Sequence, residues 1–251
     1  MEGERNVLAA RSLLSYDYIS QLCALLLDLI YHGTNVPKGR GEPILLIPGF
    51  LGGDWTMGVM AGWLNRLGYR AYFSGIDWNI DCPNKTGELL RWRLDYIAQE
   101  TGRPIVLVGH SLGGLLARFL GVNFPEQIRH VVAIGSPIDG SSWVHPLVLS
   151  TVRTLQVLRR TMDNSSPECA SRRCTCLFSQ SVFSPLPQGV GSTVIFSKGD
   201  ELVDWRACLD PRGNNQQVSG RHISLIVNRE VYHILAEVLA TYSQGKELQV
   251  A

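Results

Sequence analysis

The stretch Ile105–Leu120, IVLVGHSLGGLLARFL, constrains the fold of this chain more than any other segment. An apolar run is followed by Gly109-His110-Ser111-Leu112-Gly113 and then by apolar residues with helical spacing. A Gly-x-Ser-x-Gly pattern in this setting predicts a buried strand, a tight turn with the serine at its tip, and a helix that packs back on the strand. Side chains two residues before and after the serine would collide, and Gly114 lets the helix approach closely.

Ser111 is the candidate nucleophile of this turn. A strained backbone would make its hydroxyl project alone, and the helix N-terminus behind it would offer unpaired N–H groups and a positive dipole end to an oxyanion. The simpler interpretation is a glycine-rich turn with an incidental serine. The nucleophile hypothesis therefore requires that the rest of the chain supply a base, an acid and a second oxyanion donor.

Length and composition indicate one sizeable globular domain over residues 1–251. Hydrophobic residues make up 45% of the 251 residues, which is enough for a substantial core. Basic and acidic residues balance to a net charge of +1, and no basic stripe is present, so we expect no nucleic-acid partner. We expect no metal, because the cysteines at 169, 174 and 176 lack the spacing of a zinc site; free thiols and a disulfide both remain open for the six cysteines.

Residues 5–32 are predicted to form a helix or a helix pair before the main domain. The most apolar part, Leu22–Ile30, is too short to span a bilayer and contains Asp28. Acidic residues come early and no secretory signal is recognised, so the sequence predicts a cytoplasmic protein without an integral membrane span. A peripheral membrane contact stays open as a minor alternative.

Short apolar runs alternate with helical patterns along the rest of the chain. This alternation predicts an α/β fold with a mostly parallel sheet of about six strands flanked by helices. Residues 138–190 interrupt the alternation, and we expect them to form a small cap insertion that contacts the substrate. The expected strands are 43–47, 69–76, 105–108, 130–134, 193–197 and 216–218, with helices near 56–67, 86–101, 112–123, 146–162 and 228–242.

The base and the acid are sought after the serine along the chain, in the order serine, acid, histidine that this chemistry takes on such a fold. Asp200 is the first carboxylate after the strand 193–197, with Asp204 as its rival and Glu201 as a weaker third choice. His222 precedes the final helix and is the predicted base. The adjacent His110 is expected to point away from the serine.

The predicted oxyanion hole consists of two backbone N–H groups. One belongs to Leu112, directly after the serine, and the other to Phe50 in the glycine-rich loop after strand 43–47, with Leu51 as the alternative. Both donors are inferred from position alone, because a backbone N–H is not encoded by side-chain identity.

Five segments together resemble the α/β-hydrolase superfamily, and most closely its bacterial lipase and esterase branch. The resemblance implies a Ser111–His222–Asp200 triad that cleaves a small-molecule or lipid carboxylic ester through an acyl-enzyme, with no cofactor. Acyl transfer or thioester cleavage by the same triad is an alternative, as is a non-catalytic binding scaffold. Pro48 stands where many relatives carry a histidine, so a different hydrogen-bonding arrangement is expected behind that loop. The segments are ILLIPGFLGGD, VLVGHSLGGLLAR, VVAIGSP, VIFSKGDELVDW and SGRHISL.

Overall fold

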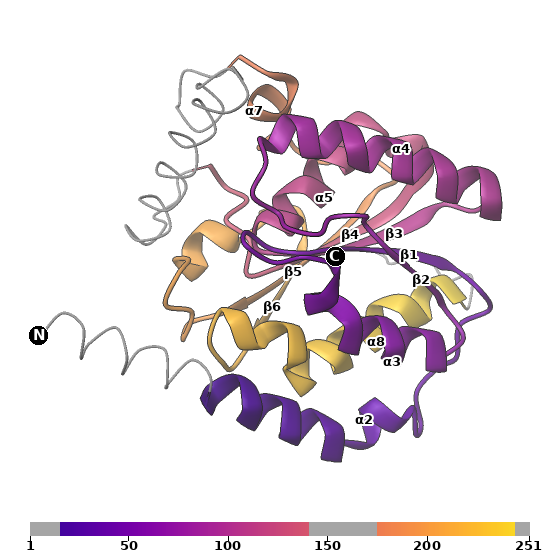
Figure 1. The fold of residues 1–251 in the computed structure, drawn as a ribbon, viewed down its shortest axis with the longest axis vertical. Coiled ribbons are helices and arrows are strands. Elements are labelled where there is room, and N and C mark those ends of the chain that lie inside the picture. The colour runs from indigo at the N-terminus through magenta and orange to yellow at the C-terminus, as the bar shows by residue number, and fades with distance from the viewer. Residues whose placement is uncertain (1–15, 141–174, 244–251) are drawn as a thin grey trace, which may run out of the picture.

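The computed structural model describes residues 16–140 and 175–243, which contain a six-stranded sheet (Figure 1). The strand order is β2-β1-β3-β4-β5-β6, and every neighbouring pair is parallel. The predicted fold class is confirmed. The strands are β1 Pro43–Ile47, β2 Arg70–Phe73, β3 Ile105–His110, β4 Ile128–Ile134, β5 Gly191–Ser197 and β6 Asn214–Val218.

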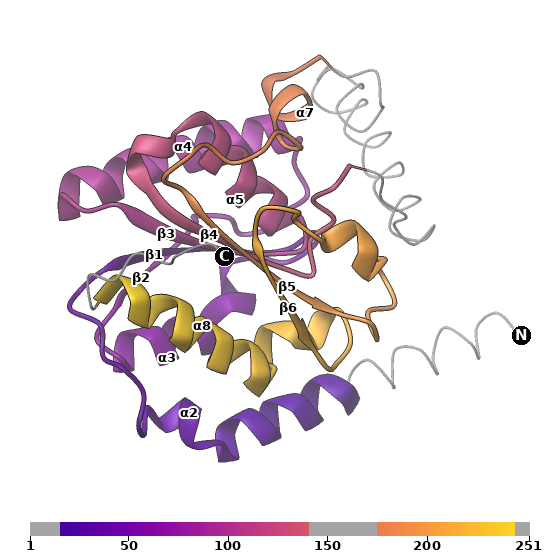
Figure 2. The same ribbon diagram turned by 180° about the vertical axis from the view of Figure 1, so that it is seen from behind.

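Helices cover both faces of the sheet, as Figures 1 and 2 show from opposite sides. One face carries α4 (Pro83–Thr101), α5 (Leu112–Asn123) and α7 (Leu177–Ser181), and the other carries α2 (Leu29–His32), α3 (Gly58–Arg66) and α8 (Arg229–Ser243). Short 3-10 helices occupy Asp54–Met57, Pro125–Gln127, Trp205–Cys208 and Ile223–Val227. No helix among the described residues combines the length and the apolar character needed to cross a membrane.

The strands differ in sequence because they differ in position within the sheet. Every residue of the inner strands β1 and β3 is buried, which explains their uninterrupted apolar runs. The edge strand β6 has the sequence NNQQV and is mostly exposed or half-buried. Polar side chains suit an unpaired edge that faces water.

The N-terminal segment is a helix pair where it is described. A helix over residues 16–27 ends at Asp28, whose carboxylate caps α2 by accepting from the N–H of Ile30 at 2.9 Å. Residues 5–15 of the predicted helix lie outside the described part of the chain.

Several predicted boundaries were wrong by a few residues. The strand predicted over 69–76 ends at Phe73, because the next two N–H groups, of Ser74 and Gly75, donate to the Asp54 carboxylate. The helix predicted from 86 begins at Pro83, a residue suited to the first helical position.

The predicted cap is described at residues 138–140 and 175–190, where α7 lies. The described residues do not include the helix predicted over 146–162, nor Cys169 and Cys174. The cap therefore stays a prediction. Cys23 and Cys208 are free thiols.

Candidate active site

Ser111 occupies the turn between β3 and α5, as the sequence predicted. Its φ of 53° lies in the left-handed region, which costs a non-glycine residue free energy. A Cβ added to Gly109 would lie 2.2 Å from the carbonyl oxygen of Gly113, so a side chain cannot fit there. The Ser111 N–H donates to the Ile134 carbonyl at 2.8 Å, which ties the turn to the end of β4.

Asp200 and His222 form a buried hydrogen-bonded pair. The Nδ1 atom of His222 lies 2.7 Å from Oδ2 of Asp200, and the two side chains are 5% and 2% exposed. The other carboxylate oxygen of Asp200 accepts from the N–H groups of Leu202 and Val203, both at 2.8 Å. These bonds fix the carboxylate and orient the imidazole. In the tautomer that donates Nδ1–H to Asp200, Nε2 can accept a proton.

The two rival acids have other partners. Asp204 caps the 3-10 helix Trp205–Cys208, where its side chain accepts from the N–H of Arg206 at 3.0 Å. Glu201 accepts from the backbone N–H of His222 at 3.2 Å and pairs with Arg221. Of the three predicted candidates, the structure therefore brings Asp200 to the His222 ring and places Glu201 behind that residue's main chain.

Gly135 connects the serine turn with this pair. It follows Ile134, the acceptor of the Ser111 N–H, and a Cβ at Gly135 would lie 3.4 Å from both Asp200 Oδ2 and His222 Cε1. Ser111, Asp200 and His222 thus lie at the same edge of the sheet. Ser111 follows the carboxyl end of β3, Asp200 follows that of β5, and His222 lies in the loop after β6. A Cβ at Gly135 would make ordinary van der Waals contact with the pair, and it is the φ of 57° in the left-handed region that favours a glycine.

His110 contacts His222, a role that the sequence analysis missed. Their ring centroids lie 4.9 Å apart, and His110 Nε2 lies 3.0 Å from the His222 carbonyl oxygen. Burial, with a further contribution from the charge of His222, lowers the pKa of His110 to about 3. The ring is therefore neutral at pH 7, with Nε2–H donating to the carbonyl. The position of His110 next to Ser111 in the sequence was a signal for this role, but its contact is with His222, which lies 112 positions further along the chain.

The loop after β1 packs against the serine turn. A Cβ added to Gly49 would lie 3.2 Å from Cβ of Ser111, and one added to Gly113 would lie 2.2 Å from the Ile47 carbonyl oxygen. The Leu51 N–H donates to the Asn79 carbonyl at 3.1 Å and is already engaged. The Phe50 N–H has no acceptor among the described residues, and Leu112, as the first residue of α5, has an N–H without an intrahelical partner. This difference favours Phe50 over Leu51.

A serine on a strained strand-to-helix turn, beside a buried carboxylate–histidine pair at one sheet edge, is the arrangement of a known family. A family model described as the alpha/beta hydrolase family matches residues 44–233. The chain belongs to the alpha/beta hydrolase family. The match runs through the described elements from β1 into α8.

Individual relatives of this chain are more distant. It is 31% identical over 110 residues to triacylglycerol lipases of Pseudarthrobacter phenanthrenivorans and Burkholderia plantarii, and this stretch is 40% of the chain. The match spans 34% and 31% of those two proteins, about a third of their length. The crystal structure of the mature Bacillus licheniformis lipase BlEst2 shares the fold, with a TM-score of 0.59 at 18% identity over 82% of this chain and 94% of that one.

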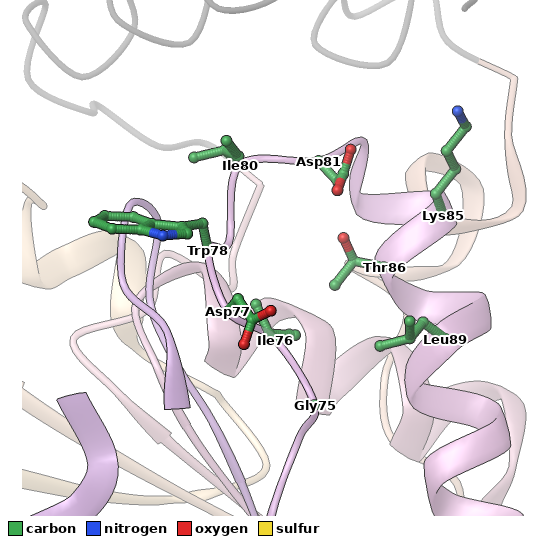
Figure 3. Close-up of a pocket in the computed structure, with 9 residues that line it drawn as sticks. All are labelled: Gly75, Ile76, Asp77, Trp78, Ile80, Asp81, Lys85, Thr86 and Leu89. Carbon is green, nitrogen blue, oxygen red and sulfur yellow. The ribbon is translucent and has the colours of Figure 1, made fainter. Parts of the chain in front are cut away.

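The structure also has a pocket beside the loop that follows β2. It measures about 560 Å³ and lies between residues 75–81 and the start of α4. Thr86 and Leu89 project from α4 toward Ile76 and Asp77 of the loop (Figure 3). Within residues 16–140 and 175–243, no three His, Cys, Asp or Glu side chains are grouped so that they could hold a metal ion.

Proposed function

We propose that this protein is a serine hydrolase that cleaves carboxylic esters through Ser111, His222 and Asp200. The observation that carries the proposal is the 2.7 Å contact between the buried His222 Nδ1 and Asp200 Oδ2 beside the strained Ser111 turn. A serine hydroxyl is a weak nucleophile at pH 7 and needs a base that is held in one orientation. The lipase names of its relatives support an ester as the substrate.

The reaction proceeds through an acyl-enzyme. His222 Nε2 removes the proton from the Ser111 hydroxyl as its oxygen attacks the ester carbonyl carbon, and the carbonyl oxygen takes up the negative charge. His222 then gives that proton to the leaving alcohol as the C–O bond breaks. Water, deprotonated by the same nitrogen, then attacks the carbonyl carbon of the acyl-enzyme. As the bond between that carbon and Ser111 Oγ breaks, His222 returns the proton to Ser111 and the acid is released.

Two interactions lower the barrier. Asp200 stabilises the positive charge that forms on His222, and its burial strengthens that attraction because little water screens the pair. The N–H groups of Phe50 and Leu112 hold the oxyanion, and each such donor contributes on the order of 10²–10³-fold to the rate.

The test is hydrolysis of p-nitrophenyl esters of increasing acyl length, together with labelling by a fluorophosphonate. Ser111→Ala should abolish both, whereas Ser192→Ala, near the start of β5 where its hydroxyl donates to Asp210, should change neither. Labelling of the Ser111→Ala protein at the wild-type rate would refute the assignment. Folded wild-type protein that neither reacts with the probe nor cleaves any ester would favour a binding scaffold. Products formed with a competing alcohol distinguish hydrolysis from acyl transfer.

A paired substitution tests the acid. Asp200→Asn leaves His222 without a charged partner and should lower kcat by about 10³–10⁴-fold. Asp204→Asn should leave kcat nearly unchanged, because Asp204 caps a 3-10 helix. An equal loss in both variants would contradict the choice between them.

A further inference from the structure

Asn79 is a buried polar residue in a loop whose positions Asp77, Trp78 and Asp81 are exposed. It follows β2 on the way to α4, and its side chain is 1% exposed, whereas the preceding Trp78 is 58% exposed. Trp78 and Ile80 line the pocket of Figure 3, whereas Asn79 between them contacts the loop after β1. Burying an amide is unfavourable unless it makes hydrogen bonds, so its contacts indicate what it does.

Three hydrogen bonds join Asn79 to residues 48–52. Its side-chain Nδ2 donates to the Pro48 carbonyl at 2.8 Å, its backbone N–H donates to the Gly52 carbonyl at 2.7 Å, and its carbonyl accepts from the Leu51 N–H at 3.1 Å. These bonds hold the main chain on both sides of Phe50. The side-chain bond is the only one of the three that a substitution can remove.

The loop that Asn79 holds is not in a relaxed conformation. Leu51 has a φ of 62°, in the left-handed region that is unfavourable for a residue with a side chain. The turn closes on itself through one bond, from the Gly52 N–H to the Gly49 carbonyl at 3.0 Å. External contacts are therefore needed to keep the Phe50 N–H in one direction.

The Pro48 carbonyl also lies close to the helix that carries the second donor. A Cβ at Gly113 would be 2.7 Å from the Pro48 oxygen, so the first turn of α5 lies directly against it. By binding that oxygen, Asn79 fixes the loop at the point where it meets the helix of Leu112. The bond thus bears on the spacing of both predicted oxyanion donors.

We propose that Asn79 is a positioning residue that holds residues 48–52 so that the Phe50 N–H faces the developing oxyanion. This inference rests on the proposed function, because it assigns Asn79 to the oxyanion site of the same triad. It also bears on Pro48, which stands where many relatives carry a histidine. Here the hydrogen bond behind the loop comes from Asn79, in a different segment of the chain.

The experiment compares Asn79→Ala and Asn79→Asp with wild type. Loss of positioning should lower kcat about 10–100-fold, less than or equal to the loss of a whole donor, while KM changes by less than about threefold. An alkyl trifluoromethyl ketone, which forms an oxyanion adduct with the serine, should bind more weakly by the same factor as kcat falls. If Asn79 contributed to stability alone, Asn79→Ala protein that is folded by circular dichroism would keep the wild-type kcat and the wild-type inhibitor affinity.

Asn79→Asp adds a readout that a structural role does not predict, and it preserves the side-chain shape if Asn79→Ala fails to fold. An ionised carboxylate repels the Pro48 carbonyl, whereas a protonated carboxyl can donate to it. The ratio of mutant to wild-type kcat should therefore rise as the pH is lowered from 8 toward 5. A pH-independent ratio would count against the proposal.

Asn123→Ala is the matched control. Its amide also donates to a backbone carbonyl, that of Phe119 at 2.7 Å, but it lies at the far end of α5. It should lose stability without losing kcat. Wild-type kcat and inhibitor affinity in folded Asn79→Ala would overturn the role of Asn79 alone, whereas a wild-type protein that the fluorophosphonate does not label would overturn the proposed function.

Discussion

The buried His130 predicts how the stability of this protein depends on pH. It lies on β4 with 1% exposure, and its ring nitrogens contact the Tyr242 hydroxyl and Thr193 Oγ1. Burial, with a smaller contribution from the nearby Arg129, lowers its pKa to about 3. Protonating this ring would place a charge in the core, so the folded state keeps it neutral.

The free-energy difference follows from proton linkage. The unfolded chain binds a proton at His130 near pH 6.5, and the folded chain does so near pH 3. The stabilisation is therefore complete above about pH 6.5 and is lost as the pH falls toward 3. Lowering the pH from 7 to 5 should remove about 2 kcal/mol at this residue. His110, with a pKa also lowered to about 3, adds a loss in the same direction.

Urea unfolding at pH 7, 6 and 5 measures this effect, with His130→Gln compared to wild type. Near pH 5.5 the free energy of unfolding should fall less steeply with decreasing pH in the variant than in wild type, by about 1.2 kcal/mol per pH unit. The variant should nevertheless be less stable than wild type at pH 7. Tyr242→Phe is the matched control, because it removes the hydroxyl partner and keeps the histidine. It should lower the free energy of unfolding at every pH with an unchanged slope.

Parallel slopes for wild type and His130→Gln would refute the reasoning. They would mean that His130 binds protons equally in the folded and unfolded states, which a buried neutral ring does not do. Comparing slopes also cancels the contribution of the carboxylates, which titrate in both proteins.

Three further predictions use the same structure. Gly113→Ala should destabilise the fold by about 1–3 kcal/mol in thermal unfolding, because its Cβ would meet backbone atoms. Gly58→Ala should not destabilise it, because Gly58 has a helical backbone and open space around it. Cys208 should resist iodoacetamide in native protein while the exposed Cys23 reacts, because burial and nearby carboxylates raise the pKa of the Cys208 thiol. Peptide mass spectrometry measures the labelling of each cysteine, and equal labelling would contradict this prediction. His110→Ala should lower kcat about 10–100-fold with little change in KM, since His222 loses a packing and hydrogen-bonding partner; unchanged steady-state kinetics would exclude that role.

Much of the architecture could be predicted from the sequence because it depends on local pattern. Apolar runs in β1 and β3 encode strands buried on both faces, and the glycines around Ser111 encode a turn that only small residues can make. The order of Ser111, Asp200 and His222 followed from the same topology. Element ends were less predictable, because they depend on contacts such as that of Asp54 with Ser74 across the chain.

The tertiary structure decided the questions that depend on distance between remote residues. Asp200 and Asp204 lie in one segment and look equivalent in sequence, yet only Asp200 reaches the His222 ring. The preference for Phe50 over Leu51 depends on the hydrogen bond that the Leu51 N–H donates to the carbonyl of Asn79, a residue remote from it in the sequence. Backbone donors and long-range amide contacts leave no pattern in the sequence, since every residue type except proline carries an N–H and any loop can hold an asparagine. Folding alone brings them together.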